Sequence, residues 1–185
     1  MSQNLKSPAA RNLIRRYLFT ALPLVLLLIS GCMARESEML GAPVEGYNHT
    51  SAAINRFTIN GAGGPNIGPY QGGGKQVCCG SVPRYWRPGL RAIVEWEKDP
   101  APRDYVNWAP LGTDAYREAY KKHEAKYTHH RAVVEIHEYD GPGPLVVHFL
   151  PCDQIRVTAA AVTPRHPDYP YKFPSKMKDT ECPKP

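Results

Sequence analysis

The sequence lacks any apolar stretch long enough to span a membrane, and it lacks the common motifs of nucleotide-binding and hydrolytic enzymes. Its apolar block, Tyr17 to Ile29, is shorter than the roughly 20 residues that a membrane-spanning helix needs. The glycine-rich stretch 61–76 is not a phosphate-binding loop, because Gln76 stands where Ser or Thr is required. It does not fit a dinucleotide fingerprint either, because Asn66 replaces the last glycine. No serine lies in a Gly-x-Ser-x-Gly sequence.

Metal and thiol chemistry are the remaining enzymatic hypotheses. His137 and His148 lie in two segments that the pattern predicts to be the arms of a hairpin, where they could approach each other and hold a metal ion. Cys78 or Cys79 could act as a nucleophile, with His49 or His148 as the base. Solvated histidines and disulfide cysteines explain the same residues more economically. We therefore expect no enzyme, no metal site and no cofactor.

The N-terminal segment has the composition of an export signal. Basic residues precede the apolar block, namely Lys6, Arg11, Arg15 and Arg16. An apolar block of this length behind a basic start is typical of a secretory signal peptide. The run Leu28-Ile29-Ser30-Gly31-Cys32 then resembles the bacterial lipoprotein signal, in which the cysteine is lipidated and becomes the new N-terminus. We expect a covalent lipid on Cys32. An ordinary signal peptide that ends near a cysteine is the alternative.

Two further features bear on the destination. Met33 follows Cys32, and the absence of Asp at that position resembles sorting to the outer membrane. We expect the mature protein on the periplasmic face of that membrane, held there by its lipid. The pair Arg15-Arg16 also occurs in twin-arginine signals, but the residues around it fit that pattern poorly. General secretion is the expected route.

The predicted signal peptide determines the expected domain boundaries and the net charge of the mature chain. We expect a signal peptide over residues 1–31, a tether over 32–45, and a single periplasmic domain over 46–185 with a C-terminal tail rich in Pro and Lys. Removing the signal peptide takes away four cations and no acidic residue, so the formal net charge falls from +6 to +2. So small a charge on an exported domain gives no reason to expect nucleic-acid binding.

The sequence has five cysteines. If Cys32 carries the lipid, then Cys78, Cys79, Cys152 and Cys182 remain, an even number in an oxidising compartment. A bridge between the neighbours Cys78 and Cys79 would strain the backbone. We therefore expect one of them to pair with Cys152 and the other with Cys182, and either assignment is open. A metal site is disfavoured because Cys-Cys lacks the spacer found in zinc sites.

Residue patterns predict a mainly β domain. Strands are expected over 54–60, 90–97, 132–136, 145–149 and 154–160, and the clearest is 90–97 because its apolar residues alternate. A hairpin is expected between 132–136 and 145–149, around a turn at 140–144. Thr113 to Tyr127 has helical spacing, with Thr113 as the N-cap. The prediction is a small β-sandwich-like single domain with one α-helix, stapled by disulfides.

One short run suggests a binding surface. Arg, Tyr and Trp are the residue types that dominate the centres of protein interfaces, and the sequence places them together at Arg84, Tyr85, Trp86 and Arg87. Alternation along a strand would bury some of them, Trp86 being the main candidate. If two of the four are exposed, they form an edge to which a partner protein can bind.

Several motifs resemble a family of uncharacterised proteobacterial lipoproteins. The resemblance covers about residues 46 to 160. It is carried by Gly46 to Thr50, Phe57 to Gly61, the glycine-rich stretch with Val77-Cys78-Cys79, Trp86 to Gly89, Trp96, and Val146 to Pro151. Members of this family are often encoded beside type VI secretion effectors, especially lipases, and some such neighbours are immunity proteins. The family supplies no catalytic residues to carry over.

The resemblance implies a function. We expect a lipoprotein that binds and neutralises a cognate type VI effector of the phospholipase class, by covering the active site of that enzyme. A structural or assembly lipoprotein of the envelope, which binds a resident partner, is the alternative. The genes beside this one distinguish the two hypotheses.

Overall fold

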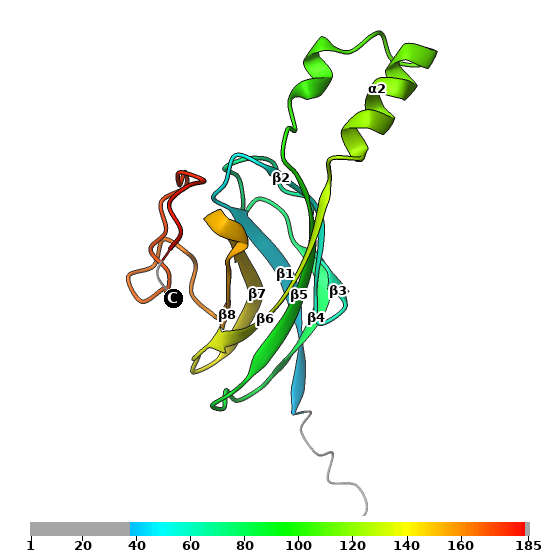
Figure 1. Ribbon diagram of the computed structural model, residues 1–185. Helices are drawn as coiled ribbons and strands as arrows, with labels where there is room; N and C mark the ends of the chain where they lie inside the picture. The colour runs from blue at the N-terminus through cyan, green and yellow to red at the C-terminus, as the bar shows by residue number, and fades with distance from the viewer. Residues whose placement is uncertain (1–37, 184–185) are drawn as a thin grey trace, which may run out of the picture. The chain divides into compact units, whose positions relative to one another are not determined.

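Eight strands form one sheet that curls until its two ends nearly meet (Figure 1). The computed structural model describes residues 38–183. The strands are β1 (Met39–Asn48), β2 (Ala53–Ile59), β3 (Ala62–Gly63), β4 (Val77–Pro83), β5 (Arg91–Asp99), β6 (Thr128–His137), β7 (Pro142–Phe149) and β8 (Ile155–Ala160). The helices are the 3₁₀ turns η1 (Asp104–Asn107) and η2 (Pro151–Asp153) and the α-helix α2 (Asp114–Glu124). None of these helices is long and apolar enough to cross a membrane.

The strand order is β3-β2-β5-β6-β8-β7-β1-β4. Neighbouring strands are antiparallel except for two parallel pairs, β1 with β7 and β6 with β8. β3 and β4, at the two ends of this order, lie against each other, so the sheet is nearly closed. The fold class is the predicted one: a mainly β domain with α2 as its α-helix and with disulfide bridges. The two halves of one curled sheet face each other, as the sheets of a sandwich do.

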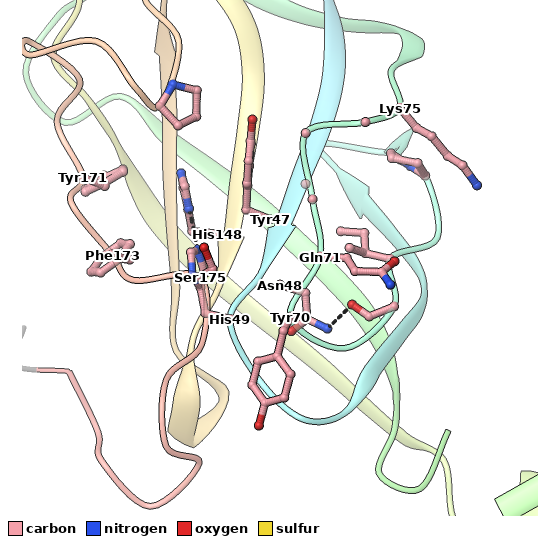
Figure 2. A pocket seen from close by; sticks show the side chains of 18 of the residues that line it. Tyr47, Asn48, His49, Tyr70, Gln71, Lys75, His148, Tyr171, Phe173 and Ser175 are labelled. Carbon is pink, nitrogen blue, oxygen red and sulfur yellow. Dashed lines mark hydrogen bonds between the residues drawn. The ribbon is translucent and has the colours of Figure 1, made fainter. Parts of the chain in front are cut away.

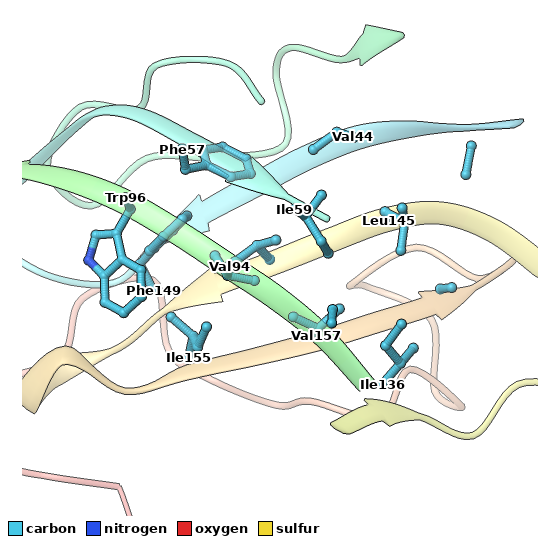
Figure 3. Close-up of a cluster of buried hydrophobic side chains, with 14 of the residues drawn as sticks. Val44, Phe57, Ile59, Val94, Trp96, Ile136, Leu145, Phe149, Ile155 and Val157 are labelled. Carbon is cyan, nitrogen blue, oxygen red and sulfur yellow. The ribbon is translucent and has the colours of Figure 1, made fainter. Parts of the chain in front are cut away.

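The hydrophobic core fills the inside of this curled sheet (Figure 3). On β5, Ala92, Val94 and Trp96 are buried while alternate residues are exposed, which confirms the predicted alternation. Phe57 and Ile59 of β2 are buried on the same inner face. The rings of Phe57 and Trp96 both contact Phe149 edge-on, at centroid distances of 5.1 and 5.9 Å.

The folded chain starts earlier than predicted. Residues 39–45, which we expected to be tether, form most of β1 and pair with β4 on one side and β7 on the other. Ala42 and Val44 are buried in the core. Pro43 lies between them where the pairing with β4 shifts register, and this irregularity hides the alternating pattern in the sequence.

The predicted hairpin between 132–136 and 145–149 is wrong. β8 lies between β6 and β7, parallel to the first and antiparallel to the second. Residues 145–149 of β7 are buried on both faces, as in a central strand that needs a partner on each edge, and β1 and β8 supply them. His137 and His148 are therefore not neighbours across a ladder. The ring of His137 lies against Tyr171 instead, with 5.6 Å between centroids.

The four predicted cysteines all form disulfides, but the predicted pairing is wrong. Cys78 bonds to its neighbour Cys79 across a cis peptide bond, and Cys152 bonds to Cys182. Cys78 and Cys79 lie on β4, at one end of the strand order. Cys152 follows β7 in η2, where the returning C-terminal chain brings the Cα atom of Cys182 to 5.4 Å.

The C-terminal segment (residues 161–183) has no helix or strand, as predicted for this Pro- and Lys-rich stretch. It covers the outer face of β1, β7 and β8, the face opposite the core. The Tyr171 hydroxyl donates a hydrogen bond to the Val157 carbonyl of β8 at 3.1 Å. The Met177 amide donates to the His49 carbonyl at 2.9 Å, just beyond β1. The Cys152–Cys182 bridge fastens the far end of the segment.

Candidate functional site

A groove of about 1060 Å³ lies on the outer face of the sheet, beside the end of β1 (Figure 2). Tyr47, His49 and His148 of the β1–β7 region form its floor. The glycine-rich loop (residues 64–76) forms one wall, and the C-terminal segment forms the other. Figure 2 shows Tyr47 between the two walls, with Tyr171 on one side and Gln71 on the other. The groove is at the upper end of the size range of small-molecule sites.

A chain of hydrogen bonds runs through the floor. The Pro174 carbonyl can only accept, so Nδ1 of His49 donates to it at 2.7 Å. In the neutral ring, Nε2 of His49 then accepts from Nδ1 of His148 at 3.0 Å. Nε2 of His148 in turn accepts from the Tyr169 hydroxyl at 2.7 Å. Every nitrogen of the two rings therefore has a partner when both histidines are uncharged.

Burial keeps these rings neutral. Burial and, to a smaller extent, the neighbouring His49 together lower the pKa of His148 to about 3. Burial also lowers the pKa of His49, although the bond to the Pro174 carbonyl acts in the opposite direction. On the phenol side, burial raises the pKa of Tyr169 well above its usual value and that of Tyr171 to about 12. The floor thus carries no charge at neutral pH.

Aromatic stacking holds the floor together. The ring of His148 stacks on the rings of Tyr47 and His49, with centroid distances of 5.2 Å to Tyr47 and 5.3 Å to His49. Phe173 of the C-terminal segment contacts both histidine rings edge-on. Tyr171 stacks on Phe173 at 5.5 Å. These contacts join three segments that are far apart in the sequence.

Asn48 positions the glycine-rich wall. Its side-chain amide donates to the carbonyls of Ala52 and Gly68, at 2.7 and 3.0 Å. Its side-chain oxygen accepts from the backbone amide and the hydroxyl of Thr50. Gly72 lies directly against the Tyr47 backbone, where a Cβ atom would be 2.5 Å from the Tyr47 Cα, so a glycine is required at this contact.

The C-terminal wall is fastened by contacts of residues 176, 179 and 182. The ammonium of Lys176 lies over the Tyr70 ring, 5.6 Å from its centroid, and so joins the two walls. The carboxylate of Asp179 accepts from the amide of Ser51 at 3.2 Å and from its hydroxyl. With the Cys152–Cys182 bridge, these contacts hold the wall in place.

Positive charge gathers at this groove. Lys75 comes from the glycine-rich wall, Arg165 and Lys172 come from the C-terminal wall, and no carboxylate lines the groove. Arg165 acts on the Tyr47 phenol: burial and Glu45 raise the pKa of Tyr47, and Arg165 opposes them. Within residues 38–183, no three or more His, Cys, Asp or Glu side chains lie close enough to hold a metal ion. The arrangement is chemically suited to binding an anion.

A second feature is the helical excursion (residues 100–127), which connects β5 to β6 and rises beyond the end of the sheet (Figure 1). Trp108 packs edge-on against Tyr116, Tyr120 and His123 of α2. Buried His123 hydrogen-bonds Asp99, at the end of β5, with 3.0 Å between Nε2 and Oδ2. The predicted N-cap is confirmed, because the Thr113 hydroxyl accepts from the Tyr116 amide at 3.1 Å.

The helical excursion exposes large apolar side chains. Leu111 is 81% exposed and Val106 is 69% exposed, and Tyr105 and Tyr120 are exposed beside them. These residues cannot reach the core because the excursion extends past it. A cluster of exposed apolar and Tyr side chains on a projecting element is typical of a protein-binding surface.

The predicted binding run lies at the opposite end of β5, in the connection from β4. Tyr85 is 73% exposed and Arg87 is exposed, whereas Trp86 is half-buried against the core and donates to the Ile136 carbonyl at 3.0 Å. Arg84 is half-buried, and its amide donates to the Glu38 carbonyl at 2.8 Å. The lipidation site predicted at Cys32 lies outside the described residues.

Sequence reasoning missed the groove and the excursion surface. The tail was read only as irregular, although Tyr169, Tyr171 and Phe173 alternate in a way that could have indicated a packed segment. The excursion was read only as a helix. Leu111 lies between Pro110 and Gly112, two residue types that mark exposed connections, so its exposure could have been predicted from the sequence.

Comparison with known proteins gives one match. No curated protein and no solved structure is similar to this chain. A family described as a protein of unknown function, DUF3304, matches residues 47–157. The match takes in Asn48, His49, His148 and the helical excursion, and it stops before the C-terminal segment. This sequence, from the end of β1 to the middle of β8, makes the chain a member of the DUF3304 family.

Proposed function

We propose that this protein is an outer-membrane lipoprotein whose periplasmic domain binds and neutralises a type VI secretion effector of the phospholipase class. The observation that carries the proposal is the helical excursion, which presents Tyr105, Val106 and Leu111 to solvent beyond the sheet. The lipoprotein signal ending at Cys32 and the family resemblance described above supply the compartment and the kind of partner.

The excursion has the properties of a preformed binding element. Trp108, packed on α2, and the His123–Asp99 hydrogen bond hold it in one arrangement. Lys126 adds an ion pair with Asp104 at 3.2 Å, which joins the two ends of the excursion. A preformed element loses little conformational entropy on binding. That matters for an immunity protein, because nanomolar affinity corresponds to about −12 kcal/mol.

A projecting element also suits the inhibition of a lipase. The active site of a lipase must admit an acyl chain, so its surroundings are apolar and concave. The narrow helical excursion, which carries Leu111 and Val106, can enter such a concave site, whereas the broad face of the sheet cannot. The exposed Tyr85 at the opposite end of β5 is too far away to share the same small concave site.

Co-expression with the cognate lipase effector that the proposal requires tests it. We expect a stable complex, and we expect the full chain to protect cells that produce the effector in their periplasm. The variant Val106→Ser/Leu111→Ser should weaken the complex by about tenfold or more, because it removes two apolar contacts.

Val133→Ser is the matched control. Val133 is also an exposed apolar residue, 52% accessible, but it lies on β6 outside the excursion. It should leave affinity within about twofold, as surface changes outside an interface do. Absence of both the complex and the protection would refute the proposal. Co-purification with a resident envelope protein, in a cell without the effector gene, would favour the structural or assembly role instead.

A further inference from the structure

The groove contains three cations that lack anionic partners in the part of the chain that the structure describes. Lys75, Arg165 and Lys172 line it, and none of them forms an ion pair within residues 38–183. Other cations of the domain do pair, including Arg56 with Glu97 at 2.6 Å and Lys126 with Asp104. Charge left unpaired at a groove is available to a ligand.

The side chains of the floor carry no negative charge, and Glu45, the carboxylate that acts on Tyr47 and Tyr169, accepts from the Gln76 side chain and does not line the groove. The two histidines of the floor are neutral and fully hydrogen-bonded, and its tyrosines stay protonated because burial raises their pKa values. No carboxylate lines the groove. The three cations of the groove are exposed, so their side chains can reach a ligand in the groove, and their attraction for an anion is screened by salt.

We propose that this groove binds a phosphorylated ligand, with Arg165 and Lys172 of the C-terminal wall holding its phosphate and Lys75 adding positive charge from the opposite wall. Guanidinium and ammonium groups together, without a competing carboxylate, form the donor set that best fits a phosphate. Within the glycine-rich wall, Gly72 and Gly73 pack against Tyr47, whereas Gly74 faces open space, so a ligand can approach the backbone closely at Gly74. A volume of about 1060 Å³ far exceeds one phosphate ion, so the ligand has an organic body as well.

The organic part of the ligand can contact the aromatic rings of the C-terminal wall. Tyr171 and Phe173 line the same groove on the C-terminal wall and offer apolar ring surface next to Arg165 and Lys172. A phosphorylated metabolite and the headgroup of a glycerophospholipid share this chemistry, a phosphate joined to a small polyol. The C-terminal segment supplies two of the three cations, so the site depends on the disulfide-fastened wall.

Calorimetric titration of the full chain in neutral detergent micelles tests the proposal. One arm uses inorganic phosphate and glycerol 3-phosphate as soluble probes. The other uses micelles that contain either phosphatidylglycerol or diacylglycerol, which lacks the phosphate. We expect Arg165→Gln/Lys172→Gln to weaken binding by about tenfold or more, with Lys75→Gln acting in the same direction.

Lys121→Gln/Lys122→Gln is the control of equal charge change. Both lysines are exposed on α2, away from the groove, and their replacement should leave affinity within about twofold. Thermal unfolding followed by circular dichroism verifies that each variant folds. Binding of glycerol 3-phosphate identifies a soluble metabolite as sufficient, and binding of phosphatidylglycerol alone identifies a lipid headgroup; either result supports the site. No binding of any phosphate probe, or equal effects of the two double variants, would overturn it.

Discussion

His148 should make the stability of this protein depend on pH in a calculable way. Its pKa is about 3 in the folded protein, against an ordinary value of 6.5, because it is buried next to His49. Between these two values the unfolded chain binds a proton that the folded chain rejects, so the free energy of unfolding falls as the pH falls. From pH 8 to pH 5 the loss from this one group is about 2 kcal/mol.

Other groups also titrate in this range, so the test compares two proteins. His148→Gln keeps a polar side chain near Tyr169 but cannot take up a proton. We expect it to be less stable than the wild type at pH 8, where the buried hydrogen bonds matter, and to lose about 2 kcal/mol less than the wild type between pH 8 and pH 5. Urea unfolding at the two pH values measures both quantities.

His137→Gln is the control, because His137 is exposed on β6 and its ring contacts only the edge of the groove wall through Tyr171. The effect of His148→Gln on the pH dependence is measured relative to this variant. If His148→Gln shows the same pH dependence as the wild type, then His148 titrates normally in the folded protein. The neutral hydrogen-bonded floor derived above would then be wrong.

Three further predictions follow from particular contacts. Asn48→Ala should lower the free energy of unfolding by about 3 kcal/mol, because four hydrogen bonds are lost in a buried site, and urea unfolding measures this. Cys152→Ser/Cys182→Ser should cost about 3–4 kcal/mol, from the chain entropy of a loop of 30 residues, and a loss below about 1 kcal/mol would contradict that estimate. Cys32→Ala should abolish palmitate labelling and release a folded domain from membranes; labelling at the wild-type level would refute the lipidation site.

Local patterns in the sequence predicted the parts of the fold that depend on neighbours along the chain. The alternation of apolar and polar residues on β5 could be recognised in the sequence because one face of that strand packs on the core and the other is exposed to water. The helix N-cap at Thr113 could be predicted because it needs only a side-chain hydroxyl three residues before the backbone amide that it accepts from, here that of Tyr116.

The order of the strands in the sheet and the pairing of the cysteines could not be predicted from local sequence patterns. Turn residues at 140–144 show where the chain reverses, but not that β8 would enter between β6 and β7. The bridge between Cys152 and Cys182 depends on the path of the C-terminal segment across the outer face of the sheet. That path is set by contacts of Tyr169 and Tyr171 with residues of β7 and β8, which no local pattern reports.

The C-terminal segment links these observations. His49 and His148 lie within the part of the chain that matches the family, whereas Tyr169, Tyr171 and Phe173, which cover them, lie beyond it. A chain that ended where the match ends would leave His148 accessible to water, and its pKa would return toward the ordinary value because burial is the main cause of the shift. It would also lack Arg165 and Lys172. The neutral state of the floor and the cations of the C-terminal wall therefore both depend on this segment, and a single alteration of it should change both the pH dependence of stability and the affinity for phosphate.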